Sequence, residues 1–240
     1  TYDSLGRTAS SAQAMAGGDS YNFLYTYLLN GNLASIRYPS GRTFNYTQDD
    51  AGRVTQMNDG AKVYAQGMTY AALGGLAQMQ LGNGLIETTG YNHRGQVSKI
   101  EAKAGTDVRF SSELGYADPV AGIYNNGNVL WQRTQRGANT WRQGYQYDGL
   151  NRLKQVSETQ MNNEGSSAWQ RDYAFSRWGN MWVSGNTSGG PVVYSFTPQS
   201  ESNFDAQNRL HIQSAGYDAA GNQTSIGGFT FGFDGENRMV

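Results

Sequence analysis

The chain has 240 residues, no cysteine and a formal net charge of −1, which excludes disulfides, thiol catalysis and cysteine-ligated zinc and does not favour nucleic acid or an anionic membrane surface as a partner. Its hydrophobic content of 38% lies below the roughly 45–50% of ordinary globular chains, yet an aromatic content of 12% opposes disorder. No stretch approaches the roughly 18–20 apolar residues that cross a bilayer. A folded, turn-rich, all-β protein is therefore expected.

Along the chain, the segment from Ser10 to Ala16 is the only one that permits a short helix or a loop. From Gly31 to Gly95, alternating strands and closely spaced turn residues, such as Pro39-Ser40-Gly41, predict one hairpin after another. Three longer inserts are interpreted as extended hairpin tips, because the same repeat chemistry resumes after each of them. They are Asp118–Gly122, Asn162–Ser167 and Gly185–Pro191.

One seven-residue phrase, aromatic-Asp-x-x-Gly/Asn-Arg/Asn-apolar, recurs through the chain. Its clearest copies are Tyr2–Arg7, Tyr147–Leu153, Phe204–Leu210, Tyr217–Asn222 and Phe233–Met239. Weaker copies contain Gly31, Gly52, Gly74, Gly95, Gly127 and Gly179 at the Gly/Asn position. The eleven Gly/Asn positions, which we call anchors, are 13 to 32 residues apart. An imperfect period of this kind favours hairpins of variable length over a rigid solenoid.

The phrase has the chemistry of a tight turn. Asp suits the first position of a type I turn, and the fourth residue must adopt a left-handed backbone, which Gly adopts most readily and Asn best among the other residues. Asn occupies this position at Asn151, Asn208 and Asn237. Each phrase is therefore predicted to be the tip of a hairpin with a bulge, in which Asp faces Arg and the aromatic residue faces the final apolar residue.

Two sets of repeated side chains also permit functional interpretations. The tryptophans could form a sugar-stacking platform, but pairing across strands is preferred; they are Trp131, Trp141, Trp169, Trp178 and Trp182. The repeated aspartates could bind calcium, but capping of turns explains each one without a metal; they are Asp3, Asp148, Asp205, Asp218 and Asp234.

No catalytic, cofactor-binding or metal-binding residue is assigned, and the chain is not expected to be an enzyme. The two histidines, His93 and His211, lie in different repeats beside turns, where a structural role is expected. Nothing selects a glycosidase pair among the scattered carboxylates Glu87, Asp107, Glu113, Glu158 and Glu164. Gly82-Asn83-Gly84 and Gly74-Gly75 lack the context of a phosphate-binding loop and are interpreted as hairpin turns.

The Tyr-Asp-x-x-Gly-Arg-Leu phrases resemble the YD repeats of the RHS-repeat family, which includes bacterial polymorphic toxins, shell components of insecticidal toxin complexes and animal teneurins. The resemblance covers essentially the whole chain and is weaker between Gly31 and Gly127. It implies a continuous antiparallel β-sheet ribbon that curls into part of a hollow shell. The closing run from Phe204 to Met239 is similar to the repeats that precede the family's core, and residues 1–240 include neither that self-cleaving core nor a toxin domain.

The resemblance implies a single continuous repeat region over residues 1–240, as a fragment of a longer protein. It implies a structural shell segment that encloses a toxin or other C-terminal polypeptide of the same protein, with neighbouring repeats as its contacts, no cofactor, no nucleic acid and a secreted or cell-surface location. The alternatives are an extracellular adhesion or glycan-binding module, with a surface glycan as partner, and an open surface fibre. The residues do not distinguish a closed shell from an open ribbon.

Overall fold

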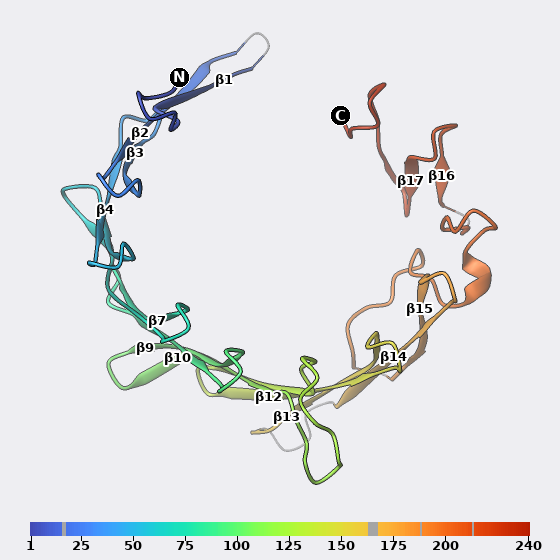
Figure 1. Cartoon of the computed structure of the whole chain (residues 1–240). Coiled ribbons are helices and arrows are strands. Elements are labelled where there is room, and N and C mark those ends of the chain that lie inside the picture. The colour runs from blue at the N-terminus through green and yellow to red at the C-terminus, as the bar shows by residue number, and fades with distance from the viewer. Residues whose placement is uncertain (16–17, 163–167, 188, 213) are drawn as a thin grey trace. The chain divides into compact units, whose positions relative to one another are not determined.

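The computed structural model describes residues 1–15, 18–162, 168–187, 189–212 and 214–240, and these residues form strands with one short 3-10 helix, η1 (Glu201–Asn203) (Figure 1). The strands are β1 (Ser10–Ala14), β2 (Ser20–Tyr27), β3 (Leu33–Arg37), β4 (Thr43–Gln48), β5 (Val54–Asn58), β6 (Val63–Tyr70), β7 (Leu76–Leu81), β8 (Ile86–Tyr91), β9 (Val97–Ala104), β10 (Asp107–Gly115), β11 (Trp131–Arg136), β12 (Asn139–Tyr147), β13 (Leu153–Gln160), β14 (Trp169–Phe175), β15 (Met181–Asn186), β16 (Gly216–Tyr217), β17 (Gln223–Ile226) and β18 (Phe229–Thr230).

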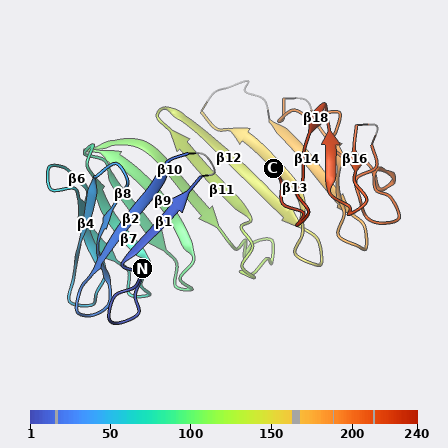
Figure 2. The same ribbon diagram turned by 90° about the horizontal axis from the view of Figure 1, so that it is seen from above.

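The chain divides into two compact units. Unit 1 comprises residues 1–113 and 135–138, and unit 2 comprises residues 114–134 and 139–240. Within each unit the strands of the main sheet lie in chain order, each antiparallel to the next, and β1 to β9 with most of β10 belong to unit 1, whereas most of β11 and β12 to β15 belong to unit 2 (Figure 2). Strands β16 to β18 form a separate three-stranded sheet. The predicted all-β architecture of successive antiparallel hairpins is confirmed.

The segment from Ser10 to Ala16, expected to be a short helix or a loop, is instead mostly strand. Strand β1 pairs with β2 in a register that runs from Ser10 opposite Leu24 to Ala14 opposite Ser20. The expectation was wrong because small and polar residues have a low intrinsic β propensity, and here pairing with the neighbouring strand decides the conformation. Ala16 lies outside the described residues.

The sheets have almost no fully buried interior. Among the described residues, Ala65 is the only buried hydrophobic residue, and large apolar side chains such as Leu5 and Leu150 are 73% exposed. In unit 1 a row of edge-to-face ring contacts joins Phe23, Tyr38, Phe44 and Tyr64, with centroids 5.1 to 5.6 Å apart. Such pairs contribute about 0.5–1.5 kcal/mol beyond area burial. Each strand is thus stabilised by its immediate neighbours, as expected for a repeat protein.

The repeated phrases form every second hairpin of the ribbon. They join β2 to β3, β4 to β5, β6 to β7 and β8 to β9 in unit 1, and β12 to β13 and β14 to β15 in unit 2. Because successive turns of an antiparallel meander lie at opposite ends of the strands, the phrase turns of each unit share one edge of its sheet. We call this the phrase edge. The turns at the opposite edge, such as Tyr38–Arg42, do not carry the full phrase.

The three inserts predicted to be extended hairpin tips are described by the structure to different extents. Asp118 pairs with Ile123 in an isolated antiparallel bridge, so the first insert is a small hairpin tip. Residues 163–167 of the second and residue 188 of the third lie outside the described residues. The two glycine pairs interpreted as turns are confirmed, because the Gly74 N–H donates to the Ala71 carbonyl and the Gly84 N–H donates to the Leu81 carbonyl, at 2.8 and 2.9 Å.

Candidate functional site

The eleven phrase turns carry the repeated chemistry of the chain. All eleven anchors have a positive φ, and Asn151, Asn208 and Asn237 are the only non-glycine residues with a positive φ in the described part of the chain, each at 60°. The register shifts by one residue at Tyr27, Gln48, Tyr70, Tyr91 and Tyr147. The predicted left-handed anchors and bulges are thus confirmed in these hairpins, whereas the bulge predicted beside the β14–β15 turn is wrong, because Phe175–Met181 and Ala174–Trp182 pair without a shift.

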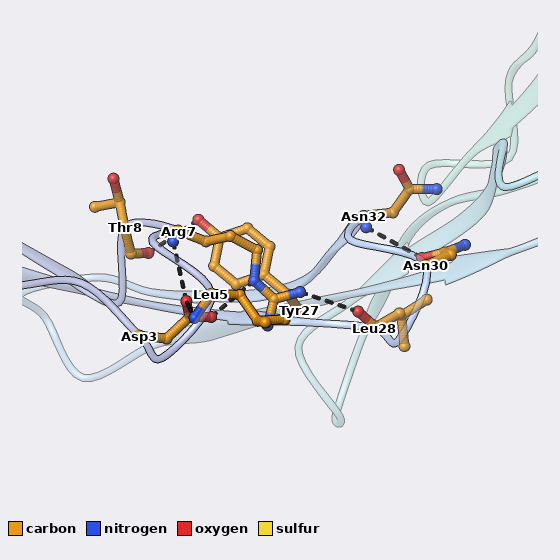
Figure 3. A network of polar contacts seen from close by, with 8 residues as sticks. All are labelled: Asp3, Leu5, Arg7, Thr8, Tyr27, Leu28, Asn30 and Asn32. Atoms are coloured by element: carbon orange, nitrogen blue, oxygen red, sulfur yellow. Dashed lines mark hydrogen bonds and ion pairs between the residues drawn. The ribbon is translucent and has the colours of Figure 1, made fainter.

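Within a phrase, the aspartate holds the turn together from both carboxylate oxygens (Figure 3). Asp3 Oδ1 accepts hydrogen bonds from the Leu5 and Arg7 backbone N–H groups, both at 2.9 Å, and Asp3 Oδ2 accepts one from Arg7 Nε at 2.7 Å. The same three bonds recur at Asp49, Asp148, Asp205 and Asp234. The turn-capping interpretation of the aspartates is confirmed.

These bonds favour the ionised form of each aspartate. The backbone N–H of Arg152, and after it the Arg152 guanidinium, hold the pKa of Asp148 below its ordinary value of 3.8. The pKa values of the other phrase aspartates are lowered by the corresponding contacts; they are Asp3, Asp49, Asp205, Asp218 and Asp234. A lowered folded-state pKa stabilises the fold above the unfolded-state pKa, and this contribution is lost as pH falls through the folded-state pKa.

Acidification below about pH 4 is therefore expected to lower the melting temperature progressively, because the unfolded chain binds more protons than the folded chain in that window. Asp148→Asn, which retains an acceptor but cannot ionise, should show a shallower loss. Thermal melts from pH 2 to 5 on the two proteins would measure this difference. Identical slopes would contradict the assignment of acid sensitivity to the turns.

The aromatic residue of the phrase lies opposite its final apolar residue, as predicted. Tyr27 pairs with Leu33, and the same pairing places Tyr147 opposite Leu153. It recurs as Tyr70 with Leu76, Tyr91 with Val97, Phe175 with Met181, Phe204 with Leu210 and Phe233 with Met239. Each of these phrases thus gains an aromatic–aliphatic pair worth roughly 0.2–1 kcal/mol.

Successive phrases are also joined to each other, which the sequence patterns did not predict. The guanidinium of Arg7 lies over the ring of Tyr27 in the next phrase, 4.6 Å from its centroid. Arg7 Nη1 also donates to the Leu28 carbonyl at 3.3 Å, and the Tyr27 hydroxyl donates back to the Thr8 carbonyl at 2.9 Å (Figure 3). The phrase arginine therefore serves its own turn through Nε and the following turn through the face of its guanidinium.

The arginine contact recurs between other neighbouring phrases. Arg53 lies over Tyr70, Arg152 over Phe175 and Arg209 over Tyr217, at 5.0, 4.4 and 5.2 Å from the ring centroids. Cation–π contacts at exposed sites contribute about 0.5–1 kcal/mol. The reciprocal hydroxyl-to-carbonyl bond recurs as Tyr70 to Val54, Tyr91 to Leu76, Tyr147 to Val129 and Tyr217 to Leu210.

Where asparagine replaces arginine, the contact to the next phrase changes to a hydrogen bond. Asn128, Asn180 and Asn222 donate their side-chain amides to Asn151, Asn208 and Asn237 at 2.9, 3.0 and 2.8 Å. In unit 1, Asn32 donates to the Gly52 carbonyl at 2.9 Å. Each acceptor residue is the anchor of the following phrase. Arginine and asparagine are thus two versions of one connection between turns.

Three phrases depart from this arrangement, and in one of them Gln96 occupies the position that arginine or asparagine occupies elsewhere. At Gly75 the connecting side chain is missing, and a β-carbon there would lie 2.5 Å from the ring of Tyr91, so the glycine makes room for the next aromatic residue. The phrase that contains Tyr124 has the predicted positive φ at Gly127, but residues 124–130 form no strand, so the hairpin predicted at this copy is wrong. Asn126 and Asn128 instead donate to the side chain of Asn151.

The tryptophans occupy four strands and one turn of unit 2. Trp141, Trp169 and Trp182 lie opposite Gln160, Glu158 and Ala174, which confirms the cross-strand interpretation for these three residues. Trp169 Nε1 also donates to Glu158 Oε1 at 3.0 Å. Trp131 lies beneath the guanidinium of Arg142, and Trp178 is 65% exposed in the β14–β15 turn.

The remaining candidate residues are dispersed. His93 and His211 are exposed, in different units. Glu87 lies on β8, Asp107 and Glu113 on β10 and Glu158 on β13, while Glu164 lies outside the described residues. Within the part of the chain that the structure describes, no group of three or more histidine or acidic side chains is placed to hold a metal ion, and no helix is long and apolar enough to cross a membrane.

The fold is similar to parts of several solved toxin-complex structures. The chain superposes over its full length on 14% of a chain in the crystal structure of TcdB2–TccC3–Cdc42, with a TM-score of 0.74 and 18% identity. It also matches 15% of a chain in TcdB2–TccC3 without the hypervariable C-terminal region, with a TM-score of 0.59 and 15% identity.

A further match is to the Tc holotoxin pore of Photorhabdus luminescens, where 92% of the chain covers 13% of the other chain with a TM-score of 0.61 and 18% identity. The chain thus spans about one seventh of the length of the chains it matches. No protein-family model and no curated protein matches the sequence. At these identities the likeness establishes the fold.

Proposed function

We propose that the chain is a structural segment of the wall of a β-sheet shell in an exported bacterial protein of the RHS/YD-repeat kind, and that the wall encloses a toxin or other polypeptide of the same protein. The observation that carries this proposal is the connection of most phrase turns within each unit to the next by arginine–aromatic or asparagine contacts. Such contacts lock neighbouring hairpins in line, which a wall requires and a binding module does not.

The burial pattern supports a wall. Side chains on both faces of the sheets are mostly half-buried, and Ala65 is the only buried hydrophobic residue among those described. A sheet whose described residues are mostly half-buried on both faces can present one face to solvent and the other to an enclosed chain. The solved structures with the same fold are chains of complexes that contain TcdB2 and TccC3 or form a Tc holotoxin pore. We assign the chain no catalytic role.

Limited proteolysis of the full natural protein that contains this segment would test enclosure. The native protein should protect an internal polypeptide, which becomes digestible only after the wall is unfolded in denaturant. Opening the wall with Tyr147→Ala should expose the same polypeptide under native conditions, whereas Gly149→Ala, at an exposed turn position with nothing within 4 Å, should leave it protected. An interior polypeptide that is digested equally fast in native and unfolded protein would contradict the proposal.

A further inference from the structure

The strand ladder of unit 2 is interrupted after β15. The next strands, β16 to β18, belong to a separate sheet. Between β15 and β16, the described residues contain only the helix η1 and the bridge between Phe204 and Leu210. One backbone hydrogen bond returns this segment to β15, from the Val183 N–H to the Pro198 carbonyl at 3.0 Å. Hydrogen bonding between regular strands therefore does not join the two sheets through the described part of this segment.

The contacts between phrase turns continue across this interruption. Before it, the guanidinium of Arg152 lies over Phe175. Across it, Asn180 donates to Asn208 at 3.0 Å, although 28 residues separate the two. After it, the guanidinium of Arg209 lies over Tyr217. The same two kinds of contact thus hold the turns together whether or not strands pair beside them.

The asparagine contact accounts for the anchors that are not glycine. Asn151, Asn208 and Asn237 each accept a hydrogen bond from the connecting asparagine of the preceding phrase. A positive φ costs conformational free energy in a residue with a side chain, and glycine avoids this cost. Glycine, however, has no side-chain acceptor. Asparagine at these anchors therefore costs some conformational free energy in the backbone but gains a hydrogen bond to the neighbouring turn.

We propose that the row of phrase turns, rather than the sheet, carries the ribbon of unit 2 across the interruption between β15 and β16, and that Asn208 is the positioning residue of that connection. Asn208 holds a left-handed backbone in its own turn and presents Oδ1 to Asn180 of the preceding turn. The inference goes beyond the proposed shell, because it does not depend on what the ribbon encloses.

Hydrogen exchange on the 240-residue chain would test this. In Asn208→Gly, the Val183 and His211 amides should exchange about two- to tenfold faster. This increase corresponds to lowering the free energy of local opening by the roughly 0.5–1.5 kcal/mol of one neutral hydrogen bond. These amides donate to the Pro198 and Asn203 carbonyls and so report on the docking of the intervening segment. Amides of β12 should exchange at the wild-type rate.

Three further variants make the test specific. Asn208→Asp retains an acceptor and tolerates a positive φ, so it should restore slow exchange. Asn180→Ala should raise exchange as Asn208→Gly does, and the double variant should be no worse than either single variant. Asn222→Ala removes the equivalent contact two connections further along and should leave Val183 unaffected. Wild-type exchange in both Asn208→Gly and Asn180→Ala, or additive effects in the double variant, would overturn the proposal.

Discussion

Replacing Tyr147 with alanine is expected to lower the free energy of unfolding by about 2–3 kcal/mol, below the roughly 3–5 kcal/mol typical of fully buried aromatic residues because Tyr147 is half-buried. The ring faces Leu153 across the hairpin, and its hydroxyl donates to the Val129 carbonyl at 2.8 Å. The substitution therefore removes a contact within one phrase and a contact to the preceding one. Urea denaturation with a linear extrapolation would measure the change.

The matched variant Asp148→Ala should destabilise less than Tyr147→Ala, although Asp148 makes three hydrogen bonds within the turn. The turn is exposed, so water can replace the lost acceptor, and an exposed ion pair adds little. Tyr147→Phe retains the ring and should lose only the roughly 0.5–1.5 kcal/mol of one hydrogen bond. If Asp148→Ala proved the more harmful change, the aromatic pair would not be the main source of stability in the phrase.

Replacing Gly82 with alanine is expected to destabilise unit 1 by about 1–3 kcal/mol, the range typical of overpacking. A β-carbon at Gly82 would collide with the Val63 carbonyl oxygen and would lie 3.3 Å from Tyr64 Cα. These are backbone atoms that cannot rotate away. The Gly82 N–H donates to the Tyr64 carbonyl at 2.8 Å, so the close approach is part of the pairing between neighbouring strands.

The control for this prediction is Gly149→Ala. Nothing lies within 4 Å of a β-carbon at Gly149, and the residue does not need a positive φ. This variant should stay within about 0.5 kcal/mol of the wild type. Melting temperatures that fall equally in the two variants would show that the space around Gly82 is not limiting.

Most of the phrase could be predicted because its chemistry lies within seven consecutive residues. Asp3, Gly6 and Arg7 define one turn, and turn geometry is set by local propensity and by side-chain bonds to the nearby backbone. Strand β1 was missed because Ser10–Ala14 has no alternating pattern, and only its pairing with β2 makes it a strand. The phrase that contains Tyr124 is recognisable in the sequence, but residues 124–130 form no hairpin.

The contacts between turns could not be predicted from a fixed sequence spacing, because the donor and acceptor are 15 to 28 residues apart in the asparagine pairs. A signal was nevertheless present. The connecting residue is asparagine in the phrase before each of Asn151, Asn208 and Asn237, so the two substitutions occur together. Taken alone, each phrase predicts a separate hairpin tip, in which the tolerance of asparagine for a positive φ is enough to explain Asn208.

The division of turns between two edges has a consequence for how such chains can change in length. The contacts between phrase turns fix the spacing of the hairpins along the phrase edge. A hairpin loop at the opposite edge can be longer without altering the distance between successive anchors. Two connections opposite the phrase edges, one in each unit, already differ in length: β9 and β10 are joined by residues 105–106, and β13 and β14 by residues 161–168. Insertion of a foreign peptide should accordingly be tolerated at the opposite edge, and these tips are where new recognition sequences would accumulate during evolution.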